Sequence, residues 1–209
     1  MTAESENRGR WAVMPVKSFD MAKSRLEGVL TLSERRDLAR TLMGNALRAL
    51  VDSDCFEHVM VVSRDEAVLG FARELGAETM REEGPPDLNE ALRSVRDVAI
   101  ADGAVSLLVL FSDLPNVTGE DIRALVDASA QCGVVIGPDR RAEGTNALLL
   151  RPPDAIDYAF GDLSFGKHLA AASKAGLEVV VLRRDGIGLD VDFPEDLQAM
   201  GRPLKVPSP

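Results

Sequence analysis

Two aspartates near the end of the chain have the spacing of a metal-binding pair. Asp190 and Asp192 lie two residues apart in LDVDFPEDL (residues 189–197), so in an extended segment both side chains point to one face. Two carboxylates on one face repel each other unless a cation lies between them. Because this stretch contains no Cys or His, Mg²⁺ is favoured over Zn²⁺ as that cation. The alternative is a solvated turn that contains spaced acids.

A third carboxylate follows the most apolar run of the chain. Asp113 ends SLLVLFSD (residues 106–113), and a carboxylate at the end of a buried strand is a suitable ligand for a hard metal ion. Aspartate is equally common in turns and as a helix N-cap. Ligands of α/β sheets bind beyond the carboxyl ends of the strands, so Asp113 could meet Asp190 and Asp192 there.

Three cations lie close together after the first apolar run. Lys17, Lys23 and Arg25 fall within PVKSFDMAKSRL (residues 15–26). Cations at the carboxyl end of a first strand suit a polyphosphate, whose charge must be neutralised for attack at phosphorus. The stretch is not a Walker motif, because it lacks the Gly-x-x-x-x-Gly-Lys pattern. The competing interpretation is a solvated basic loop.

Small polar residues form a second group of candidates. Gly144 could let the backbone approach a ligand closely, and Thr145 offers a hydroxyl. Gly161 and Ser164 precede an expected helix, where Ser164 could be the cap and free N–H groups could bind an anion. Ordinary turn and capping chemistry explains these residues equally well.

Two further places are ambiguous in the same way. His168, in the first turns of that helix, could touch a phosphate, although the surface is the commoner position for such a histidine. Asp87 or Asn89, at the start of another expected helix, could bind a base edge, and Asp87 could instead be an N-cap.

Apolar runs of strand length alternate with amphipathic stretches along the chain. The expected strands cover residues 11–16, 58–63, 106–113, 133–137, 146–150 and 178–182. The expected helices cover residues 33–51, 65–75, 88–101, 119–130, 164–175 and 194–200, with Ser33 as N-cap of the first. This alternation predicts an α/β fold, a single domain with a mostly parallel central sheet and helices on both faces.

Length, charge and cysteine content limit the class of protein. The 209 residues fit one domain, expected at 11–200 between a polar, disordered leader (1–10) and a loose tail (201–209). The net charge of −10 argues against a nucleic-acid-binding face, and no apolar run reaches the length of a membrane span. Cys55 and Cys132 show neither metal-site nor disulfide spacing, which favours the reducing cytoplasm.

Five motifs, taken in order, resemble one enzyme family. PVKSFDMAKSRL, SDLP, GTNALLL, FGDLSFGKH and LDVDFPEDL are similar to segments of the guanylyltransferases that make the deazaflavin coenzyme F420. The resemblance runs from about Trp11 to Met200. Members of that family transfer GMP from GTP to phosphoenolpyruvate, 2-phospho-L-lactate or 3-phospho-D-glycerate. Their fold is similar to that of nucleotide-sugar and molybdopterin nucleotidyltransferases, a GT-A-like α/β domain.

The resemblance implies roles for the candidate residues. Three carboxylates would bind Mg²⁺: Asp113, Asp190 and Asp192. Three small residues would contact the phosphorylated acceptor: Thr145, Gly161 and Ser164. Three catalytic cations would lie along the nucleotide phosphates: Lys17, Lys23 and Arg25. A looser correspondence makes nucleoside contacts of Ser63, Asp87 and Asn89.

The expected reaction is attack of the acceptor's phosphate oxygen on the α-phosphorus of GTP, with release of pyrophosphate. Phosphoenolpyruvate is the favoured acceptor, because the Arg- and Ala-rich composition is typical of bacteria and bacterial members resemble phosphoenolpyruvate users. A downstream transferase that accepts the product is an expected partner, and the sequence does not indicate an oligomeric state.

Three other activities remain open. Transfer of a nucleotide to a sugar phosphate or molybdopterin would usually require a Gly-rich loop after the first strand, which PVKSFDMAKSRL does not supply. A glycosyltransferase would more often show an Asp-x-Asp pair at the central strand, where this chain has SDLP. A non-catalytic nucleotide-sensing module would have less need of the metal carboxylates.

Overall fold

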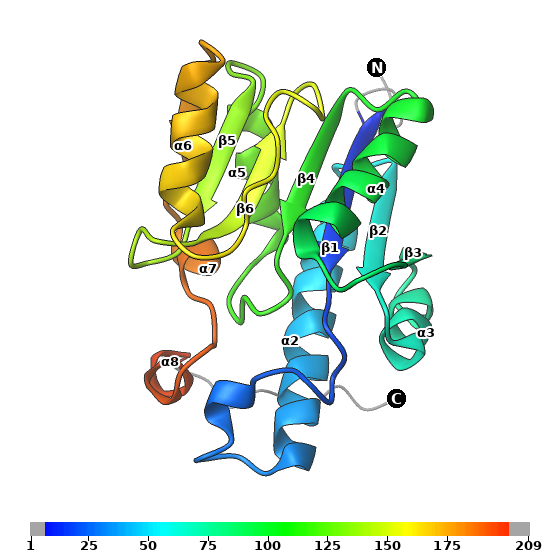
Figure 1. The fold of residues 1–209 in the computed structure, drawn as a ribbon, viewed down its shortest axis with the longest axis vertical. Helices are drawn as coiled ribbons and strands as arrows, with labels where there is room; N and C mark the ends of the chain where they lie inside the picture. Colours follow the sequence, from blue (N-terminus) through cyan, green and yellow to red (C-terminus); the bar gives the residue numbers. More distant parts are fainter. Residues whose placement is uncertain (1–6, 201–209) are drawn as a thin grey trace.

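The computed structural model describes residues 7–200 and shows one seven-stranded sheet with helices on both faces (Figure 1). The strands are β1 (Arg10–Pro15), β2 (His58–Ser63), β3 (Glu78–Arg81), β4 (Ser106–Leu110), β5 (Val134–Pro138), β6 (Thr145–Leu150) and β7 (Val179–Val181). Their order is β3-β2-β1-β4-β6-β5-β7, and only β6 runs antiparallel to its neighbours, β4 and β5. The predicted α/β fold with a mostly parallel sheet is therefore confirmed.

The central strand β4 is buried at every position because helices cover both faces of the sheet. Leu108 and Leu110 face one helical layer, and Leu107 and Val109 face the other. Alternating side chains of a strand point to opposite faces, so a run that is apolar at every position fits only a strand covered on both sides.

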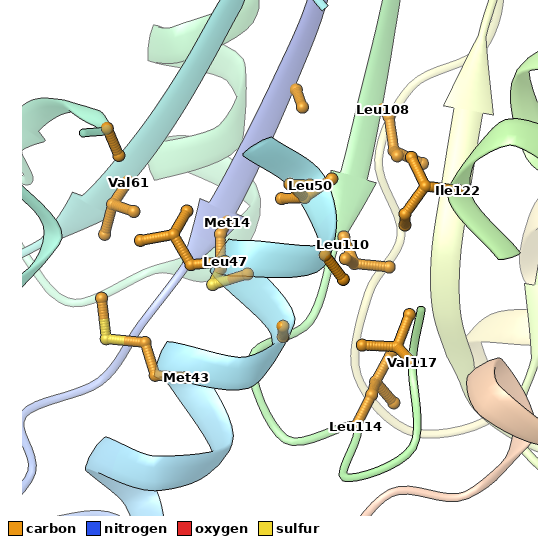
Figure 2. Close-up of a cluster of buried hydrophobic side chains, with 14 of the residues drawn as sticks. Met14, Met43, Leu47, Leu50, Val61, Leu108, Leu110, Leu114, Val117 and Ile122 are labelled. Atoms are coloured by element: carbon orange, nitrogen blue, oxygen red, sulfur yellow. The ribbon is translucent and has the colours of Figure 1, made fainter. Parts of the chain in front are cut away.

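One face of the sheet packs against α2 (Leu32–Asp52), α3 (Glu66–Glu74) and α5 (Gly119–Ala128). Figure 2 shows Leu47 and Leu50 of α2 beside Met14 of β1 and Leu110 of β4. Each of these leucines is at most 1% exposed. Complete burial of a leucine contributes about 1.5–3 kcal/mol, so this layer stabilises the sheet end from which the loop after β1 leaves.

The opposite face packs against α4 (Leu88–Ala101) and α6 (Ser164–Lys174). Trp11 and Val13 of β1 lie in this layer with Leu92 and Val95 of α4. The segment between β6 and α6 adds Ile156, Tyr158 and Phe160 to the same cluster. That segment is thereby held against the sheet just before it enters α6.

A third, smaller apolar cluster lies beyond the sheet. The amino-terminal half of α2 extends past the strands and meets the short helix η1 (Ser24–Leu26) and the segment between α7 (Asp185–Gly188) and α8 (Pro194–Ala199). Its buried residues are Leu26, Leu38, Leu42, Leu189, Val191 and Met200. This cluster brings the loop after β1 beside the segment that contains Asp190 and Asp192.

The structure corrects several local predictions. The N-cap of α2 is Thr31 rather than Ser33, since Thr31 Oγ1 accepts from the Glu34 amide (3.3 Å) and Glu34 Oε2 accepts from the Thr31 amide (2.8 Å). Strand β3 and the one-turn helices η1 and α7 were not predicted. Arg10, assigned to the leader, begins β1.

The rest of the leader and the tail fall largely outside the described residues. The structure describes residues 7–200, so the predictions for residues 1–6 and 201–209 are not addressed by it. Within the described range, no helix is both long and apolar enough to cross a membrane.

Candidate active site

The loop after β1 is attached at two points to the ends of other strands. Ser18 Oγ donates to Asp65 Oδ2 (2.6 Å), and Asp65 is the N-cap of α3, which follows β2. Lys23 Nζ donates to Asp113 Oδ2 (2.8 Å), just after β4. Lys17 lies just before the first attachment and is exposed, with no ion pair to any residue in 7–200. The loop therefore carries one cation inward and leaves another facing solvent.

Lys23 joins two of the predicted metal ligands. Its ammonium also lies 3.3 Å from Asp192 Oδ1, and its side chain is only 8% exposed. Burial opposes the charge, but the carboxylates of Asp113 and Asp192 outweigh that effect and raise the pKa of Lys23 above its usual value. The buried cation Lys23 thus pairs with two residues that follow it by 90 and 169 positions in the sequence.

Arg25 approaches the same carboxylate from the outside. Its Nη1 lies 2.8 Å from Asp192 Oδ2, and its guanidinium stacks over the Phe193 ring, 4.9 Å from the centroid. The Arg25 side chain is 60% exposed, so its ion pair is a weak one that contributes about 0–1 kcal/mol. Arg25 can leave Asp192 for a phosphate at little cost.

Asp190 completes the carboxylate group. Burial, together with the negative charges of Asp113 and Asp192, raises the pKa of Asp190 to about 6. The side chain of Asn146 partly opposes this shift through a hydrogen bond. Near neutral pH the cluster holds three carboxylates against one buried ammonium, so it carries an excess of negative charge.

The chemistry of this cluster suits a hard divalent cation, although its present arrangement is not that of a bound metal. Among residues 7–200, no three His, Cys, Asp or Glu side chains are grouped closely enough to hold an ion. The Lys23 ammonium lies between Asp113 and Asp192 instead. Carboxylate oxygens with unbalanced charge are the donors that Mg²⁺ prefers. The metal assignment of Asp113, Asp190 and Asp192 remains a prediction.

The predicted acceptor contacts come together from β6 and the start of α6. Thr145 begins β6, and Ser164 begins α6 after a turn in which the Ser164 amide donates to the Gly161 carbonyl (3.2 Å). Gly161 has φ +119°, which L side chains rarely adopt, so the turn requires glycine there. The Phe165 amide donates to the Glu143 carbonyl (3.0 Å), which ties this turn to the residues before Thr145.

Ser164 does not cap α6, contrary to the prediction. The N-cap is Leu163, in a left-handed conformation (φ 55°) and without a side-chain capping bond. Ser164 lies instead in the first turn and is buried. The helix start is therefore shaped by its backbone turn rather than by a capping hydroxyl.

His168 is a buried residue, which overturns its expected surface position. Its side chain is inaccessible to solvent, its Nδ1 lies 3.0 Å from Thr145 Oγ1, and its Nε2 accepts from the Ala159 amide (3.1 Å). Burial, with a smaller effect of Lys167, lowers its pKa to about 4, so the ring is neutral near pH 7. The signal was its helical face: Ser164, His168 and Ala172 recur every four residues, and all three are buried.

The predicted nucleoside contacts have local hydrogen bonds. Ser63 Oγ accepts from the Asp65 amide (3.1 Å), and Asp87 is the N-cap of α4. Asn89 pairs twice with the Phe160 backbone, through Nδ2 to the carbonyl (3.2 Å) and Oδ1 to the amide (2.9 Å). Contact with a nucleoside remains a prediction for these residues.

Two features at this end of the sheet were not predicted from the sequence. Asn146 is buried and donates through Nδ2 to the Ile187 carbonyl (2.8 Å), which places α7 beside the carboxylates. Arg141, after β5, stacks over the Phe193 ring, 5.0 Å from its centroid. The adjacent arginines at 140 and 141, which begin two residues after a buried strand, were the available signal for the second feature.

Comparisons with known proteins identify the family. Residues 10–201 match the family model described as guanylyl transferase CofC like. A phosphoenolpyruvate guanylyltransferase from Sphaerobacter thermophilus is 43% identical over 189 residues, covering 90% of this chain and 91% of the relative. A 2-phospho-L-lactate guanylyltransferase from Methanothermobacter thermautotrophicus is 38% identical over 186 residues, covering 89% and 81%.

A solved structure agrees at the level of the fold. A nucleotidyl transferase from Methanothermobacter superposes with a TM-score of 0.64 at 17% identity, over 92% of this chain and 96% of that one. At that identity the superposition supports the architecture alone. The family model and the relatives of 43% and 38% identity show that this chain is a nucleotidyltransferase that belongs to the CofC-like guanylyl transferase family.

Proposed function

We propose that this chain is a Mg²⁺-dependent guanylyltransferase that joins GMP from GTP to phosphoenolpyruvate in coenzyme F420 biosynthesis. The observation that carries the proposal is that Lys23 pairs with Asp113 and Asp192 beyond the carboxyl ends of the parallel strands, where the charges of both carboxylates also act on Asp190. Such a cluster has too much negative charge for its one buried cation, and the exposed Arg25 beside it suits a phosphate.

The reaction needs little proton chemistry from the protein. A phosphate oxygen of the acceptor bonds to the α-phosphorus of GTP, the bond to the bridging oxygen breaks, and pyrophosphate leaves with that electron pair. The acceptor phosphate is already anionic at neutral pH, so no strong general base is required. Catalysis then depends on positioning and charge neutralisation, as in other phosphoryl-type transfers.

Each predicted residue has a part in this scheme. Asp113, Asp190 and Asp192 would hold Mg²⁺, which would neutralise phosphate charge when bound. Lys23 would offset the repulsion between the acceptor and GTP, and the exposed Lys17 and Arg25 would bind along the triphosphate. Ser63, Asp87 and Asn89 would contact the nucleoside.

The acceptor would bind between β6 and the turn before α6. Thr145, Gly161 and Ser164 would hold an acid that carries both a carboxylate and a phosphate. Phosphoenolpyruvate is proposed because the relative of 43% identity is named for it, whereas the relative of 38% identity is named for 2-phospho-L-lactate. A pocket separates such similar acids by only about 1–3 kcal/mol unless it hydrogen-bonds the distinguishing group.

The product would contain a diphosphate bridge between guanosine and the acid. This bridge is an activated linkage, so a downstream transferase that consumes it is the expected partner. The cytoplasm, which supplies GTP and the acceptor, is the expected location.

The test is pyrophosphate release from GTP and Mg²⁺ with each acceptor in turn: phosphoenolpyruvate, 2-phospho-L-lactate and 3-phospho-D-glycerate. We expect release with phosphoenolpyruvate, none when ATP replaces GTP, and none when the metal is removed with a chelator. Release with a different acceptor would correct the substrate. Binding of GTP without release in any mixture would instead favour a nucleotide-sensing module.

A further inference from the structure

His168 has two hydrogen bonds that together determine which ring nitrogen carries its proton. Its Nε2 lies 3.1 Å from the Ala159 amide nitrogen. A backbone N–H can only donate, so Nε2 must be the unprotonated, accepting nitrogen. Because the ring is neutral, its single proton is then on Nδ1.

The protonated Nδ1 faces Thr145, at 3.0 Å from Oγ1. An N–H can only donate, so the Thr145 hydroxyl accepts from His168 through its oxygen. The hydroxyl's own proton is left for a different acceptor. With the opposite tautomer, Thr145 would donate to His168 and present only lone pairs to the site, which an anion would avoid.

The same histidine connects the two segments that carry the predicted acceptor contacts. Through Thr145 it reaches the start of β6, and through Ala159 it reaches the segment that leads to Gly161. The Phe160 ring packs edge-on against His168, with centroids 4.8 Å apart, and Asn89 holds the Phe160 backbone at both its amide and its carbonyl. The imidazole is therefore held by two hydrogen bonds and an aromatic contact before any ligand binds.

We propose that His168 is a positioning residue that sets the Thr145 hydroxyl to donate its hydrogen bond to an anionic oxygen of the acceptor. His168 touches neither the acceptor nor the reacting atoms. The part that concerns the acceptor rests on the proposed function, whereas the tautomer follows from the protein's own hydrogen bonds.

Two substitutions separate the two hydrogen bonds of the ring. In His168→Asn the amide N–H lies where Nδ1–H was and can still donate to Thr145. In His168→Gln the longer amide reaches the Nε2 position and can accept from Ala159, but it loses the donor to Thr145.

We expect His168→Gln to raise the KM for the acceptor roughly 10- to 100-fold, the usual effect of losing a hydrogen bond to a charged group. The KM for GTP should stay unchanged, and His168→Asn should recover most of the loss.

A double-mutant cycle tests whether His168 acts through Thr145. Thr145→Val should raise the acceptor KM as much as His168→Gln does, and the double variant should be no worse than Thr145→Val alone. Additive losses, or an effect of His168→Gln on kcat and GTP affinity alone, would overturn the proposal. Thermal unfolding of each variant checks that it folds.

A measurement on the unmodified protein covers the case in which the variants do not fold. Nitrogen-15 NMR of the imidazole, without substrates, distinguishes the two neutral tautomers. We expect the Nδ1–H form, and an Nε2–H form would overturn the inference. Absence of turnover with every acceptor would instead contradict the proposed function, so the two failures can be told apart.

Discussion

The carboxylate cluster and the Thr145–His168 region lie at the same end of the sheet, beyond the carboxyl ends of the parallel strands. They differ in how many of their charged and polar groups already have a partner. Three carboxylates face one buried ammonium in the first, and burial with mutual repulsion raises the pKa of Asp190 to about 6. In the second, both nitrogens of His168 have partners within 3.1 Å, and its side chain is inaccessible to solvent.

This difference indicates two ways of preparing a binding site. The cluster keeps unbalanced charge, which a cation and phosphates would neutralise, so its geometry is expected to change on binding. In the Thr145–His168 region both ring nitrogens of His168 are paired in advance and only the Thr145 hydroxyl proton is left to donate, so binding there requires little reorganisation. Changes in the first region should affect rate and metal dependence, and changes in the second should affect acceptor affinity.

The largest effect is expected from removal of a cluster carboxylate. Asp192→Ala and Asp190→Ala should each lower kcat by about 1000-fold or more, because they remove ligands of the predicted metal. Pyrophosphate release measures the loss, and circular dichroism checks the fold. Asp154→Ala is the matched control, because Asp154 is an exposed acid that follows β6 at the opposite end of the sheet. Near-normal activity of both cluster variants would contradict the metal assignment.

Lys23→Met should have the next largest effect. It removes the ammonium between Asp113 and Asp192, and we expect a loss of roughly 100-fold in kcat from the missing phosphate neutralisation. Without Mg²⁺ the variant should unfold at a lower temperature, since two carboxylates lose their partner. Added Mg²⁺ should restore more of the melting temperature in the variant than in the unmodified protein. An equal response to Mg²⁺ in both proteins would contradict the idea that Lys23 and the metal serve the same carboxylates.

Asp190 should make stability depend on pH in a defined direction. Its folded pKa of about 6 lies above its ordinary value of 3.8, so the folded state favours the protonated form. The free energy of unfolding should fall as pH rises from about 4 to about 6 and stay lower above that, by roughly 1–3 kcal/mol. Asp190→Asn should remove this loss, so it should be the more stable protein at about pH 8 and nearly equal to the unmodified one at about pH 4.

Urea unfolding of both proteins at the two pH values measures the difference. Because all other titrating groups are shared, the comparison isolates Asp190. If the two proteins differ in their free energy of unfolding by the same amount at both pH values, ionisation of Asp190 does not destabilise the folded state. The variant should be inactive at either pH, which separates its stability from its function.

Much of the fold and the carboxylate cluster could be predicted from local patterns. The apolar run ending at Asp113 and the two-residue spacing of Asp190 and Asp192 each contain the relevant information within a few residues. The antiparallel direction of β6 was also readable, because only six residues separate Pro138 from Thr145 and a parallel connection needs a dozen or more. The capping box of α2 was another available signal, with Glu34 three residues after Thr31.

Other features depend on contacts between distant segments. Strand β3 (Glu78–Arg81) is only partly buried at its two middle residues, so it has no alternating pattern that a sequence could show. The tautomer of His168 is determined by the Ala159 amide. Packing brings this amide to the ring, and no sequence motif predicts the contact. The pairing of Lys23 with Asp113 and Asp192 requires the third apolar cluster, formed from segments far apart in the chain.

The smallest effect is expected at Arg25, on the exposed side of the cluster. Its pair with Asp192 is largely solvated, so Arg25→Ala should lower the free energy of unfolding by less than about 1 kcal/mol. If Arg25 moves to a phosphate when GTP binds, the variant should raise the KM for GTP roughly 3- to 10-fold and leave the acceptor KM unchanged. Initial rates with each substrate varied in turn measure both constants. Arg183→Ala, which removes an exposed arginine stacked on Phe165 instead, controls for the loss of a surface charge. A larger change in acceptor KM than in GTP KM would assign Arg25 to acceptor binding. That result would contradict the separation of roles between the carboxylate cluster and the Thr145–His168 region.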